Sequence, residues 1–266
     1  MKVLFNLWHH RPDPHGGQLF IYHLAHLMTM TGLVEARVGQ DQDPTWIEPE
    51  HRAFRIADPT WGEDAIQIVP EVDYEGHGVP ICQGPRCLGR VIQWLPPKAI
   101  VVGPMIAGAL YQALPDCEIL YAPIFIFRDQ FPETPKTGEV VGIDFVHGAG
   151  KAEVAPVPYR RLRGSHAEVI AGMLSASAFY YPVINTGLDY PVVEAMAAGC
   201  HVITGANVGS LGFVRHGINA TIGAWDGKVD PVLGIRARGH ILRFHEAGAV
   251  MPEVKALIRS LDGKSS

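Results

Sequence analysis

The sequence predicts an α/β protein in which helices cover parallel sheets. Short apolar runs typical of buried strands alternate with runs of helical periodicity along most of the chain. Residues 178–204 contain one complete unit of this kind, in the order strand, loop, short helix, strand. Residues 128–139 are polar, contain prolines and resemble a linker between two halves. A chain of 266 residues suits one large domain or two small ones.

The composition is that of a globular protein. Hydrophobic residues make up 47% of the chain and charged residues 18%, which allows substantial cores. A net charge of −5 excludes a global positive field that would attract nucleic acid. The four cysteines show no CxxC or zinc-type spacing, and the sequence shows no secretory leader or membrane-length apolar run. We therefore expect a cytoplasmic protein with no membrane span.

The first element is an apolar strand over residues 2–8, followed by a loop and a helix over residues 18–30. Gly16 and Gly17 stand where the loop gives way to the helix. A glycine pair there either lets backbone N–H groups approach an anion near the positive end of the helix dipole, or simply makes a tight turn.

The same loop carries several ionisable side chains. Its histidines (His9, His10 and His15) have no carboxylate or cysteine partner at ligand spacing, so we expect no metal site. Asp13 and His15 could instead act as catalytic acid or base, or contact phosphate. Both residue types are compatible with either role.

The remaining elements of the first half follow in order. Apolar runs predict strands over residues 34–38, 66–69, 99–102 and 119–122, with a helix over 105–114. Residues 40–63 are polar and predicted to be loop-rich. Residues 73–89 hold four glycines and are predicted to be a mobile loop.

The second half begins with a strand over residues 140–147. A basic cluster, residues 159–163, is predicted to be either an exposed loop or a phosphate contact. Ser165 and Glu168 have the spacing of a capping box, which predicts a helix to about residue 174. Two further helical stretches fill residues 233–261, the last from 252 to 261.

The unit over residues 178–204 is the most informative part of the chain. Asp189 is a candidate N-cap, Pro191 stands in the first helical turn, and Gly199 ends the helix. A second strand follows over residues 200–204. In a parallel sheet, the loop between the first strand and the helix opens at the edge where such sheets bind ligands.

This stretch resembles the donor-binding segment of GT-B glycosyltransferases, especially the glycogen-synthase-like family GT4. The resemblance is carried by an ordered series of residues: Gly187-Leu188-Asp189-Tyr190-Pro191, Glu194-Ala195-Met196-Ala197-Ala198-Gly199, Val208-Gly209-Ser210, Phe213-Val214 and His216-Gly217-Ile218-Asn219-Ala220. Two family positions differ: Thr186 replaces the first of two glutamates, and Asp189 replaces the second glycine of the loop.

The resemblance implies a compact GT-B fold of two Rossmann-like domains facing a cleft. Residues 1–130 would form the acceptor-side domain and residues 131–266 the nucleotide-sugar-binding domain. The implied activity is transfer of a sugar from a nucleotide-diphosphate sugar, the co-substrate, to an acceptor hydroxyl, with no bound cofactor or metal.

The resemblance also implies roles for individual residues. Glu194 would hold the donor ribose, and the loop from Gly187 to Pro191 would hold the sugar and phosphates. Lys151 would meet the diphosphate, and His147 stands near a family arginine with the same role. Gly16 and Gly17 match a glycine pair that faces the donor phosphates and the acceptor. Read by residue type alone, Glu194 and Lys151 could instead be solvated side chains.

Two other readings of function stay open. A non-catalytic nucleotide-sugar-binding protein would account for Thr186. A phage-type DNA base glycosyltransferase would suit the small size, although the charge of −5 counts against it. The acceptor is therefore a glycan, a small molecule or DNA. The sequence determines neither the donor base and sugar nor the stereochemical course.

Overall fold

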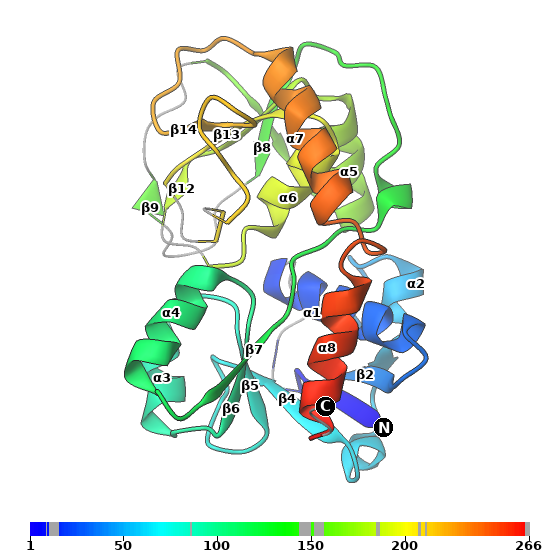
Figure 1. The fold of residues 1–266 in the computed structure, drawn as a ribbon. Helices are drawn as coiled ribbons and strands as arrows, with labels where there is room; N and C mark the ends of the chain where they lie inside the picture. The colour runs from blue at the N-terminus through cyan, green and yellow to red at the C-terminus, as the bar shows by residue number, and fades with distance from the viewer. Residues whose placement is uncertain are drawn as a thin grey trace. The chain divides into compact units, whose positions relative to one another are not determined.

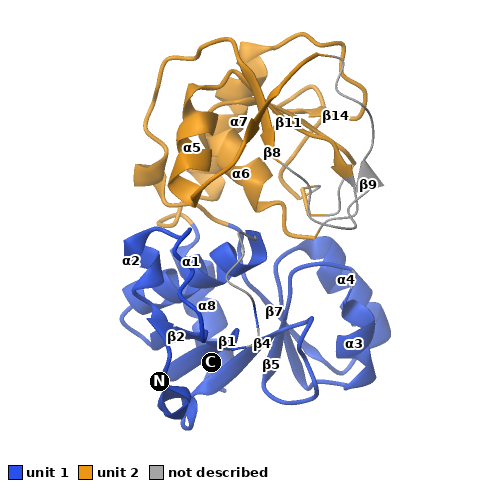
Figure 2. Ribbon diagram, turned by 180° about the vertical axis from the view of Figure 1, so that it is seen from behind, with its two compact units in different colours: residues 1–124, 250–266 blue, residues 125–249 orange. Residues whose placement is uncertain are grey.

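A computed structural model of the chain describes all residues except 9, 11–15, 86, 144–149, 152–156, 185–186, 207–208, 211 and 264–266. The chain divides into two compact units, shown in Figure 2. Unit 1 comprises residues 1–124 and 250–266, and unit 2 comprises residues 125–249. Each unit is built on its own parallel sheet, so the predicted α/β class is confirmed.

The described strands of unit 1 form a seven-stranded sheet in the order β3-β2-β1-β4-β5-β6-β7, with every neighbouring pair parallel. The strands are β1 (Lys2–Asn6), β2 (Glu35–Gly39), β3 (Arg55–Ile56), β4 (Ile66–Pro70), β5 (Val79–Cys82), β6 (Lys98–Val101) and β7 (Glu118–Tyr121). The central strands are almost continuously apolar, as expected for a sheet buried on both faces.

Helices cover both faces of this sheet. They are α1 (Gly16–Met30), α2 (Pro49–Arg52), α3 (Leu88–Gln93), α4 (Pro104–Ala113) and α8 (Met251–Leu261), with a 3₁₀ turn, η1 (Pro59–Gly62). Helices α1 and α8 lie together on one side of the sheet and α3 and α4 on the other (Figure 1). The chain thus returns to unit 1 at its end, because α8 buries an apolar stripe formed by Val254, Leu257, Ile258 and Leu261.

Two predictions for unit 1 need correction. The glycine-rich residues 73–89, predicted to be a mobile loop, contain the buried strand β5. Residues 40–63, predicted to be loop-rich, contain α2, β3 and η1. In both segments the elements are two to four residues long, too short for periodicity to reveal them.

The described strands of unit 2 form a five-stranded parallel sheet in the order β10-β8-β11-β13-β14. Its strands are β8 (Val140–Ile143), β10 (Arg160–Leu162), β11 (Ala178–Tyr181), β13 (His201–Thr204) and β14 (Thr221–Ile222). A separate antiparallel pair joins β9 (Gly150–Lys151) to β12 (Val183–Ile184). The predicted exposed basic loop at 159–163 is in part the edge strand β10, where Arg160 forms a two-point salt bridge with Glu139.

The helices of unit 2 are α5 (His166–Ser175), α6 (Tyr190–Ala197) and α7 (Pro231–Phe244), with a 3₁₀ turn, η2 (Arg128–Gln130). Helix α6 contacts both α5 and α7, so the three pack in a row. The predicted capping box opens α5. The Ser165 hydroxyl accepts from the backbone N–H of Glu168, and the Glu168 carboxylate accepts from the backbone N–H of Ser165. A small cluster of Ala178, Tyr180, Ile203 and Trp225 adds to the core of this unit.

The boundary between the units falls earlier than the predicted break at residues 130 and 131. Phe125, Ile126 and Phe131 are almost fully buried, and Ile126 pairs with Glu246, all within unit 2. The backbone N–H of Ile126 donates to the carbonyl of His245 at 2.8 Å. Polar residues between these anchors give the segment its linker-like appearance, while its few apolar side chains tie it to the unit 2 core.

Among the described residues, every helix falls short of the length and apolarity that crossing a membrane requires.

Candidate functional site

The sheet of unit 2 has a topological switch point between β8 and β11. From β8 the chain runs outward to β10, and from there it crosses back to β11 on the other side. In open parallel sheets, ligands bind outside the carboxyl ends of the strands at such a point. The segments that follow β8, β11 and β13 therefore define the candidate site, and these segments carry Lys151, Gly187–Pro191 and Gly209.

Helix α6 begins at this edge as predicted. Pro191 lies in its first turn, where a missing N–H costs nothing. The Tyr190 hydroxyl donates to the carbonyl of Phe125 at 2.8 Å and so anchors the start of the helix within unit 2. Gly187, Leu188 and Pro191 are only half-buried, whereas Asp189 and Tyr190 are buried. Of these five residues, the three half-buried ones are the most accessible.

Asp189 behaves differently from the predicted N-cap. It stands directly before α6, but its side chain makes no capping hydrogen bond within the described part of that helix. Instead it is fully buried. Burial, and after it the nearby charge of Asp189, raises the pKa of the Tyr181 phenol. The carboxylate thus lies against the end of β11.

Two loops touch at the entrance to α6. A Cβ placed on Gly209 would lie 1.4 Å from the carbonyl oxygen of Gly187 and 3.1 Å from the amide nitrogen of Asp189. Only glycine permits this approach. The segment after β13 therefore supports the loop after β11, and this contact explains why a glycine follows Val208 in the resembling series.

Glu194 is buried rather than solvated. It projects from the middle of α6, and its Oε1 lies 2.5 Å from Nε2 of His166, the first residue of α5. Both side chains are about 95% buried. A buried carboxylate needs such a partner because an unpaired one would lose its hydration without compensation. His166 was missed in the sequence, where it reads only as part of a capping box.

Lys151 lies beside the loop that leads to α6. In the β9–β12 pair it stands opposite Val183, four residues before Gly187. This backbone register brings the segment after β8 to the segment after β11, as a shared diphosphate site requires. The other predicted residues of unit 2, His147 and Thr186, lie outside the described residues, as do Asp13 and His15 of the first loop.

Unit 1 has its own switch point, between β1 and β4. Helix α1 starts at Gly16, two residues earlier than predicted, so the glycine pair forms its first turn. Gln83, just after β5, donates its side-chain amide to the carbonyl of Gly17 at 3.0 Å. Nearby Glu71, just after β4, accepts hydrogen bonds from the backbone of Gln83 and Gly84. These contacts join the start of α1 to the ends of β4 and β5.

Glu71 is a second residue that sequence reasoning missed. Burial raises its pKa to about 7, against the lowering effect of the backbone hydrogen bonds from its own amide, Gln83 and Gly84. Such a carboxyl group changes its protonation state near neutral pH, which is a property of acid–base residues. The sequence signal was weak: a single glutamate following an apolar strand.

Solved structures of glycosyltransferases match the chain over nearly its whole length. Sucrose-phosphate synthase from Thermosynechococcus elongatus aligns with a TM-score of 0.70 at 12% identity, over 99% of this chain and 100% of that one. Anabaena HepE in complex with UDP-glucose gives 0.67 at 12% identity, over 98% and 100%. A glycosyltransferase from Rickettsia africae gives 0.64 at 8% identity, over 99% of each chain.

The chain has the GT-B fold. The predicted fold class is thereby confirmed, whereas membership of the GT4 family stays a prediction. No protein-family model and no curated protein matches the sequence. At such low identities the GT-B likeness concerns the fold, so the roles of individual residues rest on the geometry described above.

Proposed function

We propose that this protein is a glycosyltransferase that moves a sugar from a nucleotide-diphosphate sugar to an acceptor hydroxyl. The observation that supports the proposal is the GT-B fold, in which the backbone of Lys151 pairs with the segment leading to the Gly187–Pro191 loop and α6, which carries Glu194, begins at that loop. UDP-glucose is the first donor to test, because HepE was solved with it.

Within this proposal, each residue has a physical task. Glu194, held by His166, accepts hydrogen bonds from the ribose hydroxyls. Amides of the loop from Gly187 to Pro191 face the sugar and phosphates. Lys151 neutralises part of the diphosphate charge as a point charge. Catalysis then consists mainly of positioning and of stabilising the nucleotide as it leaves, without a bound metal.

We assign the acceptor side to unit 1. Gly16 and Gly17 would face the phosphates and the acceptor, and Asp13 and His15 would supply acid–base chemistry. His147 would add a second positive group near the diphosphate when protonated. The acceptor itself, whether glycan, small molecule or DNA, is for experiment to identify.

The deciding experiment measures product formation from labelled nucleotide sugars, beginning with UDP-glucose, in the presence of pooled glycans, small-molecule alcohols and DNA. We expect release of the nucleoside diphosphate and transfer of label, both unaffected by EDTA. Donor binding without hydrolysis or transfer to any acceptor would replace this proposal with a non-catalytic binding protein. Dependence on added metal would overturn only the metal-independent mechanism.

Lys151 offers a specific test of the diphosphate site. Lys151→Ala should weaken binding of UDP by about tenfold or more and leave the binding of uridine unchanged, because only UDP carries the charge that the lysine meets. Calorimetric titration of both ligands measures the two effects. Lys228→Ala, which removes an exposed lysine of the same unit, is the matched control. Equal weakening for UDP and uridine would place Lys151 outside the phosphate site.

A further inference from the structure

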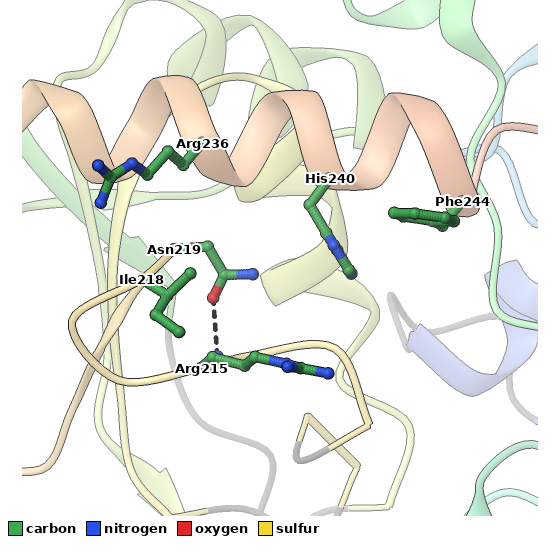
Figure 3. Close-up of a pocket in the computed structure, with 6 residues that line it drawn as sticks. All are labelled: Arg215, Ile218, Asn219, Arg236, His240 and Phe244. Atoms are coloured by element: carbon green, nitrogen blue, oxygen red, sulfur yellow. Dashed lines mark hydrogen bonds between the residues drawn. The ribbon is translucent and has the colours of Figure 1, made fainter.

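Unit 2 has a pocket outside the residues assigned to the donor. It has a volume of about 480 Å³, within the usual range for small-ligand sites. Helix α7 forms one wall and the segment before β14 the other, as Figure 3 shows. The lining residues are Arg215, Ile218, Asn219, Arg236, His240 and Phe244.

Helix geometry positions one wall of the pocket, and hydrogen bonds within the loop position the other. Arg236, His240 and Phe244 stand four residues apart, so α7 presents them along a single face. On the opposite wall the buried Asn219 holds its own loop: its Oδ1 accepts from the backbone N–H of Arg215 at 2.7 Å, and its Nδ2 donates to the carbonyl of Phe213 at 2.9 Å. The Asn219 contact with Arg215 is the dashed line in Figure 3. The pocket therefore exists before any ligand arrives.

The pocket is cationic. Two guanidinium groups and one imidazole line it, with no carboxylate among the lining residues. Within the described part of the chain, neither Arg215 nor Arg236 forms an ion pair. Burial lowers the pKa of His240, and the neighbouring His245 and Arg215 lower it further. The positive charge of the pocket therefore comes from the two arginines, because the lowered pKa favours the uncharged imidazole of His240.

The pocket also offers apolar contact. Ile218 and Phe244 are 54% and 53% exposed, so both offer apolar surface to a ligand. In Figure 3 the Phe244 ring lies along α7 beyond His240, the Arg215 side chain extends below His240, and the Arg236 guanidinium lies toward the opposite end of the helix. A ligand held by its charge at Arg215, beside His240, would place an attached apolar group against Phe244.

We propose that this pocket is a second ligand site that binds an organic phosphate, with the phosphate on Arg215 beside His240 and the apolar part of the ligand on Phe244. Guanidinium groups match phosphate oxygens in charge and in geometry. The inference is independent of the proposed transferase activity, because none of its residues belongs to the donor site. A soluble organic phosphate and a lipid phosphate headgroup share this chemistry.

Phenyl phosphate is the simplest probe, since it carries one phosphate and one ring. Titration calorimetry should show binding to the wild-type chain, weakened about tenfold by Arg215→Gln. Arg259→Gln, which removes the same charge from an exposed position on α8, is the matched control and should bind as the wild type does. Inorganic phosphate should bind more weakly than phenyl phosphate, and Phe244→Ala should abolish this difference.

A second arm distinguishes the two sources of phosphate. Co-sedimentation is measured with vesicles of phosphatidylglycerol and, for comparison, of neutral phosphatidylcholine. Sedimentation with the anionic vesicles alone, lost in Arg215→Gln and kept in Arg259→Gln, supports a lipid headgroup. Binding of phenyl phosphate without sedimentation supports a soluble ligand. If neither probe binds, or if the pocket variants bind as the wild type does, the proposal is overturned.

Glu194→Gln separates this site from the donor site. It should leave the binding of phenyl phosphate unchanged, because Glu194 does not line the pocket. Loss of phenyl phosphate binding in this variant would show that the probe occupies the donor site and would overturn the second site.

Discussion

Glu194 and His166 show how a single contact changes the reading of a residue. On a helix considered alone, Glu194 could be a solvated surface glutamate. In the structure both side chains are buried and their atoms lie 2.5 Å apart. Burying a carboxylate is costly unless a partner restores its hydrogen bonds. The pair therefore holds Glu194 in a fixed position within α6, as the proposed ribose contact requires.

Glu194→Gln tests that role. Glutamine keeps the shape and can still accept a hydrogen bond from His166, but it lacks the charge that strengthens bonds to ribose hydroxyls. We expect a loss on the order of 1.5–3 kcal/mol in UDP-glucose binding, with little change in melting temperature. Calorimetry and thermal denaturation measure the two quantities. Glu253→Gln, at an exposed position on α8, is the control. Unchanged affinity would remove Glu194 from the donor site.

Glu71 makes stability depend on pH in a direction opposite to that of most carboxylates. Its pKa is about 7 in the folded chain, against an ordinary value of 4.5. Between these values the folded chain binds more protons than the unfolded chain, so the free energy of unfolding falls as pH rises. Below pH 4.5 the contribution is fully present, and above pH 7 it is lost. The loss is on the order of 3 kcal/mol.

Glu71→Gln should abolish this dependence, because glutamine stays neutral and can still accept the backbone hydrogen bonds. Urea denaturation at pH 5 and pH 8 measures the difference. We expect the variant to be more stable than the wild type at pH 8, with a smaller gap or none at pH 5. The exposed Glu75→Gln serves as control. A wild type that gains stability relative to the variant between pH 5 and pH 8 would contradict the raised pKa.

At the scale of elements, the sequence predicted well wherever local rules decide the structure. Helix α5 begins at its capping box, and α6 begins after Asp189 with a proline in its first turn. Residues whose role depends on distant partners could not be predicted in the same way. The Nζ atom of Lys136 donates to the carbonyls of Leu174 at 2.8 Å and Ala198 at 2.6 Å, at the ends of α5 and α6. In the sequence it is one polar residue of a linker.

The residues of the candidate site also differ in whether a local sequence pattern or a distant partner decides their role. The Gly187–Pro191 loop and Glu194 could be placed from a local pattern of turn and helix residues. His166 could not, because its partner lies 28 residues away on another helix. Likewise, β5 was hidden among glycines, since its four residues are defined by pairing with β4 and β6 rather than by their own periodicity.

Gly209 gives a test of how two loops support one site. Gly209→Ala places a methyl group against the carbonyl of Gly187, so one of the loops must move. We expect unit 2 to lose about 1–3 kcal/mol of stability and the donor affinity to fall with it. Gly239→Ala is the matched control, because its Cβ would meet nothing within 4 Å on exposed helix α7. It should gain up to about 1 kcal/mol. A Gly209→Ala variant that behaves like the control would show that the loops do not constrain each other.

At the scale of the whole molecule, each unit packs together segments that lie far apart in the sequence. Segment 125–131 belongs to unit 2, although it looks like a linker, because Phe125 and Phe131 are buried there. Arg238 of α7 donates to the carbonyl of Phe131 at 2.7 Å. Helix α8 in turn belongs to unit 1, whereas a division at residue 130 would assign it to the second half. Two independent sheets thus share one chain that leaves unit 1 and returns to it.

Leu257→Ala tests which of the two units α8 stabilises. The side chain is 3% exposed, and α8 contacts α1 and β7. Truncating a buried leucine removes transfer free energy and leaves a cavity, which costs about 2–5 kcal/mol. We expect faster hydrogen exchange in β1 and β7 and unchanged exchange in β13. Ala256→Gln, at an exposed position of the same helix, should change neither. If Leu257→Ala instead released the amides of β13, α8 would be part of the core of unit 2, and the division at residues 124 and 250 would be wrong.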